Sequence, residues 1–197
     1  MQKPKAQTLD AICDAARAKS FNYQEIGASR KAFPMPDDFP GHYRHSHYRT
    51  ELGGGEKVFL DACHAFSQWR MFDLDWLHLC LPHSISCEVG ANMTIMGDVF
   101  GLWWPNANRI VYVLDENQEG VQLFGFAYGT LQGNMICGEE RFLLEWHPQN
   151  DRVYYDIYSF SRPSQWLSRC AVYYLRRLQR RFVRDSTQSM IKAINKN

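Results

Sequence analysis

Two adjacent glutamates follow a glycine-asparagine turn in the stretch GFAYGTLQGNMICGEERF, residues 125–142. A pair of carboxylates can work as general acid and base when burial drives their pKa values apart. Successive side chains of a β-strand point to opposite faces of the sheet, so at most one of Glu139 and Glu140 faces inward. This spacing argues against a two-carboxylate mechanism and leaves one inward glutamate, assisted by Tyr128, as the candidate acid or base.

The strand before this turn alternates large and small side chains. In FGFAYGTL, residues 124–131, the aromatic side chains share one face, and Gly125, Ala127 and Gly129 leave the other face nearly bare. Glycine inside a strand commonly marks the close approach of another element. The bare face therefore predicts either close packing against a helix or another backbone, or room for a ligand.

Arginines are candidate partners for the inward glutamate. Arg109 or Arg162 would form a buried ion pair with it, either structural or a polar anchor in an apolar pocket. Arg162 lies in SRP, residues 161–163, where the last strand leads into a helix and Ser161 or Ser164 can cap that helix. A guanidinium at a helix start opposes the macrodipole and favours a carboxylate or an anionic ligand nearby.

Other kinds of site have little support in the sequence. His45 and His47 would share a strand face, but no third metal ligand follows at a characteristic spacing. The chain has no G-x-S-x-G motif, and LGGGEKVF, residues 52–59, lacks the ending of a phosphate-binding loop. We expect no metal and no cofactor.

Composition bounds the class of protein. The chain has 197 residues and a formal net charge of +1, which favours a single domain and gives no general reason to expect nucleic acid as a partner. The arginines of RRLQRRFVR, residues 176–184, form either a solvated helix face or a surface for phosphate or lipid headgroups. An aromatic content of 14% suits either a filled core or an apolar cavity.

Cysteine spacing and hydropathy indicate the compartment. The six cysteines are scattered without a C-x-x-C pair, the first ten residues do not resemble a signal peptide, and no apolar run is long enough to span a bilayer. We expect a cytoplasmic protein with reduced thiols.

The candidate site residues must be positioned by helices and strands, which the spacing of apolar residues predicts. Helical spacing predicts a short helix over residues 8–19, a second helix after the glycines at 53–55, and a long amphipathic helix from Ser164 to the C-terminus. A strand over residues 42–53 precedes the second helix, and six short alternating segments between Trp76 and Phe160 predict an antiparallel meander.

A curved antiparallel sheet needs a cover for its apolar face, and a long helix with one apolar stripe supplies it. The sequence therefore predicts an α+β helix-grip fold, in which a curved sheet grips the C-terminal helix. Residues 1–20 are expected to be a helical extension, and residues 21–197 a single domain.

Several motifs resemble, in order, the family called domain of unknown function 1990 (UPF0548-like). They are FNYQEIGASR, LGGGEKVFLDACHAFSQWRMFDL, RIVYVLDE, FGFAYGTLQGNMICGEERF, YSFSRP and LRRLQRRF. The match covers residues 21–193. The family is similar to helix-grip proteins of the START and pollen-allergen-like group, whose members bind lipids, hormones or polyketides, and some of which catalyse cyclisation or hydrolysis. In the family a histidine usually follows the glycine of the turn, where this chain has Asn134, which argues against a general acid or base at that position.

The resemblance singles out matching positions without fixing their roles. They are Arg109, Gly125, Tyr128, Gly129, Thr130, Gly138, Glu139, Glu140, Phe142, Ser161, Arg162 and Pro163.

Three hypotheses follow from the residues and the resemblance together. The first is a binding protein for a small apolar or amphipathic molecule, with Arg109, Tyr128, Thr130, Ser161, Arg162 and Glu139 or Glu140 as its contacts. The second is a cyclase, hydratase or hydrolase of the same fold that uses Glu139 or Glu140 as acid or base. The third is a structural or interaction module without a ligand.

Overall fold

The computed structural model describes residues 11, 14–31, 39–81, 87–99, 102–164 and 172–195. Its elements are η1 (Ala28–Arg30), β1 (Arg44–Gly54), α2 (Glu56–Ser67), η2 (Arg70–Phe72), β2 (Leu77–Cys80), β3 (Asn92–Val99), β4 (Leu102–Gln118), β5 (Val121–Thr130), β6 (Ile136–His147), β7 (Arg152–Pro163) and α4 (Val172–Ile194).

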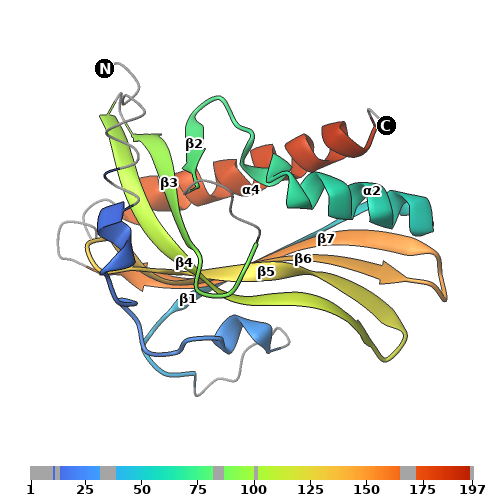
Figure 1. Cartoon of the computed structure of the whole chain (residues 1–197), viewed down its shortest axis with the longest axis horizontal. Coiled ribbons are helices and arrows are strands. Elements are labelled where there is room, and N and C mark those ends of the chain that lie inside the picture. The colour runs from blue at the N-terminus through green and yellow to red at the C-terminus, as the bar shows by residue number, and fades with distance from the viewer. Residues whose placement is uncertain are drawn as a thin grey trace.

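The strands form one seven-stranded antiparallel sheet in the order β1-β7-β6-β5-β4-β3-β2. The meander from β2 to β7 is the predicted one, and β1 closes it by pairing with β7. Both long helices lie on the same face of the curved sheet, whereas η1 and the chain around it lie on the other face (Figure 1). The predicted α+β helix-grip architecture is confirmed. We call the helix-covered face concave and the opposite face convex.

Aromatic side chains fill the concave face beneath α2. Phe66 of α2 meets Phe126 of β5 with ring centroids 5.4 Å apart, and Phe126 stacks on Phe142 of β6 at the same separation. Tyr155 of β7 completes this layer and is fully buried. Much of the aromatic content is therefore explained by a filled core at this end of the molecule.

The C-terminal helix is attached most firmly along its second half. Phe182, Met190 and Ile194 are buried, and the Ser186 hydroxyl hydrogen bonds the Tyr155 hydroxyl of β7 at 2.9 Å. The predicted apolar stripe thus faces the sheet, as expected. Residues 165–171, where the helix was predicted to begin, lie outside the described residues. None of the helices described is both long and apolar enough to cross a membrane.

Strand β4 begins earlier than its sequence suggests. Alternation was recognised only over residues 109–116, because Pro105 interrupts the pattern before it. In the structure, the part of β4 before Asn108 pairs with β3 alone, so a proline lies in a stretch of strand with one free edge. This early part of β4 supplies Trp104 and Asn106 to the cavity described below.

The described part of the N-terminal segment packs on the sheet. Residues 14–17 are helical, and Ala16 is fully buried against Ala107 and Leu131. Phe21 forms an isolated bridge with Leu131. The other residues of the helix predicted over residues 8–19 lie largely outside the described part of the chain.

Candidate functional site

A cavity of about 490 Å³ lies between the concave face and the first half of α4, beyond the end of the filled core. The strands supply most of its wall, and α4 supplies Tyr174, Arg176, Leu178, Gln179 and Phe182. The apolar part of the lining includes Trp76, Leu77, Ile95 and Trp104. The aromatic residues counted in the composition therefore contribute both to a filled core and to the lining of a cavity.

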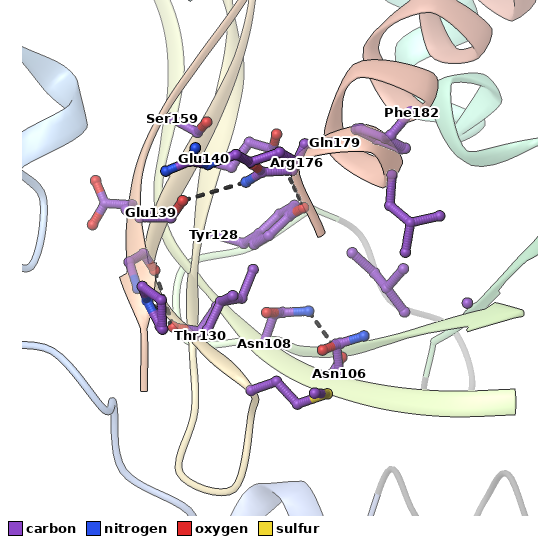
Figure 2. A pocket seen from close by; sticks show the side chains of 18 of the residues that line it. Asn106, Asn108, Tyr128, Thr130, Glu139, Glu140, Ser159, Arg176, Gln179 and Phe182 are labelled. Atoms are coloured by element: carbon purple, nitrogen blue, oxygen red, sulfur yellow. Dashed lines mark hydrogen bonds between the residues drawn. The ribbon is translucent and has the colours of Figure 1, made fainter. Parts of the chain in front are cut away.

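The Glu140 carboxyl lies in this cavity beside Tyr128. The Tyr128 hydroxyl donates a hydrogen bond to Glu140 Oε2 across the β5–β6 pair, where the two residues are directly opposite (Figure 2). Burial raises the pKa of Glu140 to about 7, although the hydrogen bond from Tyr128 lowers it. Burial also raises the pKa of Tyr128 well above its usual value, and the Glu140 charge adds to this. Glu140 can therefore exchange a proton near neutral pH while Tyr128 remains a donor.

Glu139 points to the opposite side of the sheet (Figure 2). It is buried beneath the N-terminal segment, where Tyr23 Oη (2.7 Å), Gly27 N–H (2.8 Å), Ser29 N–H (2.9 Å) and the Ser29 hydroxyl all donate to its carboxylate. The strand alternation thus separates the two glutamates as predicted. Glu139 borders the cavity, but both of its carboxylate oxygens accept hydrogen bonds from the N-terminal segment.

The bare strand face is covered by packing. A Cβ at Gly129 would lie 2.0 Å from Tyr23 Oη, and a Cβ at Gly125 would lie 2.2 Å from the Phe142 carbonyl oxygen. Ala127, between them, is fully buried. Of the two alternatives open from the sequence, close approach is the observed one: the space beside these glycines holds protein, and the cavity lies on the other face.

The remaining candidate residues divide between the cavity and its surroundings. Thr130 lines the cavity, but its hydroxyl donates to Asn22 Oδ1 at 2.6 Å and accepts from the Gly138 N–H at 2.9 Å. Ser161 also lines it and accepts a hydrogen bond from Gln179 Nε2 of α4 at 3.3 Å. Thr130 is therefore satisfied by protein, whereas Ser161 links the sheet to the helix beside the open space.

The two predicted arginines have different positions. Arg162 lines the cavity, and its guanidinium donates to the Gly41 carbonyl at 3.1 Å and lies over the Tyr43 ring. Arg109 is not among the lining residues: its guanidinium donates to the carbonyl of Lys19 at 2.8 Å and to Asn92 Oδ1 at 2.8 Å. Neither forms an ion pair with Glu140 in the structure, because one guanidinium turns to the loop before β1 and the other to the N-terminal segment.

The described histidines and cysteines form neither a metal site nor a disulfide. No group of three or more histidine, cysteine, aspartate or glutamate side chains is arranged there to hold a metal ion. His45 hydrogen bonds the Tyr158 hydroxyl at 2.8 Å, and His47 hydrogen bonds Asp156. Cys63, Cys87 and Cys137 are thiols that form no disulfide.

Comparison with known proteins places this site in a family. A family model described as "Domain of unknown function (DUF1990)" matches residues 22–189. The chain belongs to the DUF1990 family. Curated relatives named UPF0548 protein include one from Dictyostelium discoideum, 32% identical over 100% of this chain and 95% of the relative, and one from Deinococcus radiodurans, 29% identical over 98% and 97%.

Solved structures resemble this DUF1990 chain in fold at low sequence identity. A hypothetical protein from Helicobacter pylori superimposes with a TM-score of 0.56 at 9% identity, over 82% of this chain and 95% of that one. Human STARD10 gives a TM-score of 0.48 at 9% identity, over 100% of this chain and 82% of that one. The first likeness concerns the fold alone, and the second is too weak to carry an argument.

Asn134 of this DUF1990 chain follows the glycine of the β5–β6 turn. Its side chain accepts from the Ala107 N–H at 3.1 Å and donates to the Ala107 carbonyl at 2.8 Å, and the residue is buried. The amide therefore fastens the β5–β6 turn to β4. A carboxamide does not act as an acid or base near neutral pH, so we expect no proton transfer by Asn134.

Sequence reasoning missed several residues that line the cavity. They are Arg44, Trp76, Asn106, Asn108, Ser159 and Gln179. The alternation of β7 could have placed Ser159 and Ser161 on one face, since both are separated from Tyr155 by an even number of positions. No pattern in the sequence places Arg44 and Asn106 in the cavity wall, because their position there depends on the curvature of the sheet.

Proposed function

We propose that this protein binds a small apolar or amphipathic molecule in the cavity between its sheet and α4. The observation that supports this most directly is the cavity of about 490 Å³, within the range of about 300–1,000 Å³ typical of ligand sites. Its lining combines aromatic and aliphatic side chains with a few polar groups. This is the usual composition of a pocket that binds an apolar body and fixes its orientation.

Glu140 and Tyr128 are the proposed polar anchor inside the cavity. Glu140 Oε2 accepts the Tyr128 hydroxyl, and Oε1 accepts no hydrogen bond from the described residues. Glu140 is partly buried and lines the cavity, so a ligand hydroxyl or amine could donate a hydrogen bond to Oε1. Ser161 and the cavity-lining Asn108 would contribute at the wall, and Arg162 at the rim.

The partly filled interior bears on the alternative of a structural module without a ligand. That alternative would be favoured by a core filled throughout and a large apolar surface patch. The core is filled beneath α2, but the space beneath the first half of α4 is open. Ligand binding accounts for this open half, and a purely structural role does not.

Native mass spectrometry of freshly purified protein, joined to one pair of variants, tests the proposal. Gly97 lines the cavity, and a Cβ at this position meets no atom within 4 Å, so Gly97→Phe should fill the space. Gly97→Ala adds only a methyl group and is the matched control. We expect co-purified mass and binding of an apolar fluorescent probe in the parent and in Gly97→Ala, and loss of both in Gly97→Phe.

The proposal fails if the parent shows a clean ligand-free mass and binds no apolar probe. It also fails if Gly97→Phe, folded as judged by circular dichroism, binds the probe as well as the parent does.

An enzyme that acts on the same ligand is the second candidate function. One specific observation favours it: the pKa of Glu140 is raised to about 7 by burial, and a general acid or base works best with a pKa near the working pH. Tyr128, opposite Glu140, would hold the carboxyl in place or donate to substrate. If the bound molecule identified by mass spectrometry is recovered unchanged after prolonged incubation with the protein, this candidate is rejected and binding is retained.

A further inference from the structure

Most arginines of the described chain are paired with carboxylates. Ion pairs join arginine to aspartate or glutamate at Arg17, Arg30, Arg49, Arg70, Arg141, Arg152, Arg181 and Arg184. Four exposed arginines, Arg44, Arg176, Arg177 and Arg180, have neither an ion pair nor a hydrogen bond to another described residue. Two of these four, Arg44 and Arg176, line the cavity.

Arg44 and Arg176 flank the same contact between sheet and helix. Arg44 of β1 is directly opposite Ser161 of β7. Ser161 accepts a hydrogen bond from Gln179, which lies one turn after Arg176 on α4. Arg176 and Gln179 thus belong to the stretch of helix that faces the strands across the cavity (Figure 2). Arg44 and Arg176 therefore line the cavity on the two sides of this Ser161–Gln179 contact, one from β1 and the other from α4.

Among the residues that the structure describes, no carboxylate forms an ion pair with either arginine. The two acidic residues of the lining are Glu139 and Glu140. Glu139 is turned to the convex face and saturated by four donors, and Glu140 pairs with Tyr128. Arg162, the third arginine of the lining, is occupied by the Gly41 carbonyl and the Tyr43 ring. The apolar cavity therefore ends at two uncompensated positive charges.

We propose that the ligand is an amphipathic anion, whose carboxylate or phosphate lies between Arg44 and Arg176 while its apolar body extends into the cavity toward Glu140. Guanidinium groups form strong charge-assisted hydrogen bonds with both kinds of anion. This inference rests on the proposed binding function and specifies the chemical class and the orientation of the ligand.

Arg177 gives a matched control for this assignment. It is exposed and unpaired like Arg176 and is adjacent to it on α4, but it does not line the cavity. General attraction of an anion to a basic helix would involve Arg177 as much as Arg176. A specific site involves Arg176 alone.

Fluorescence titration of the full chain tests the proposal with three probes: cis-parinaric acid, its methyl ester, and a long-chain alkyl phosphate competing with the ester. We expect the acid, or the alkyl phosphate, to bind about tenfold more tightly than the uncharged ester. Arg44→Gln and Arg176→Gln should each weaken the anionic probe about fivefold and leave the ester within about twofold, and Arg177→Gln should change neither. Which of the two anions binds more tightly identifies the headgroup.

Equal affinity for the acid, the phosphate and the ester overturns this inference and leaves apolar binding intact. Equal loss in Arg176→Gln and Arg177→Gln also overturns it, because it shows nonspecific attraction to the helix. If none of the three probes binds, the proposed binding function fails together with it. Raising the ionic strength supports the inference if it weakens the anionic probes and spares the ester.

Discussion

Tyr128 and Glu140 lie directly opposite each other on β5 and β6, and the tyrosine hydroxyl donates to the carboxylate inside the cavity. Glu140 forms no ion pair with another described residue, and desolvation of its carboxyl raises the pKa to about 7. An ionised carboxylate in this position is unfavourable for the folded state. This cost to stability supports the proposed role of the pair in binding or proton transfer.

The first prediction concerns the pH dependence of stability. The pKa of Glu140 is about 7 in the folded protein and about 4.5 in the unfolded chain. Below about pH 4.5 the carboxyl is protonated in both states and does not change the free energy of unfolding. As the pH rises from about 4.5 toward 7, only the unfolded chain loses the proton readily, so the folded state is destabilised. Glu140→Gln keeps an acceptor for Tyr128 and removes the titration. We expect the variant to match the parent at pH 4 and to exceed it by up to about 3 kcal/mol at pH 8 in urea unfolding. An equal difference at both pH values would contradict this.

Tyr128→Phe tests the same pair from the other side. The hydrogen bond from Tyr128 favours the charged form of Glu140 and lowers its pKa, so its removal should raise that pKa above about 7. A ¹³C NMR titration of the glutamate side chains measures this directly. An unchanged or lower pKa of Glu140 in the variant would show that the hydrogen bond is not formed in solution.

Glu139→Gln should act on stability without an effect on the cavity. The carboxylate accepts from Tyr23, Gly27 and Ser29, and a glutamine would place an N–H₂ group against at least one of these donors. We expect a loss of about 1–3 kcal/mol in the free energy of unfolding. Probe binding at a temperature where the variant is folded should equal that of the parent. A loss of binding with unchanged stability would place Glu139 in the site.

Gly129→Ala tests the close approach of Tyr23. The added methyl group would lie 2.0 Å from Tyr23 Oη and 2.7 Å from Cζ, so the ring must move and its bond to Glu139 is strained. We expect a loss of about 1–3 kcal/mol, the usual cost of overpacking. Since Tyr23→Phe removes the atom nearest to the methyl group, the double variant should lose less than the sum of the single losses in thermal unfolding. Strict additivity would mean that the two residues do not touch.

The order of elements and the strand alternation could be predicted because they depend on local periodicity. That same alternation separated Glu139 from Glu140 correctly. What the sequence could not say is which partner covers each face. Gly129 is equally suited to a cavity and to a tyrosine, and Tyr23 lies more than a hundred positions away along the chain.

The partners of the arginines could not be predicted from the sequence either. The sequence makes Arg109 and Arg162 candidate partners of the inward glutamate, but a long side chain takes its partners from tertiary structure. Arg109 reaches the carbonyls of residues 17 and 19, and Arg162 reaches Gly41. Arg44 and Arg176 line the cavity only because β1 pairs with β7 and α4 crosses the sheet near them.

The opposite placement of Glu139 and Glu140 has a consequence for how such a protein can change over time. One position serves the attachment of the N-terminal segment, and its immediate neighbour serves the cavity. Substitutions that change the lining of the cavity can therefore accumulate on the concave face of β6 while the convex face continues to hold the N-terminal segment. Two adjacent residues of the chain are then subject to different evolutionary constraints.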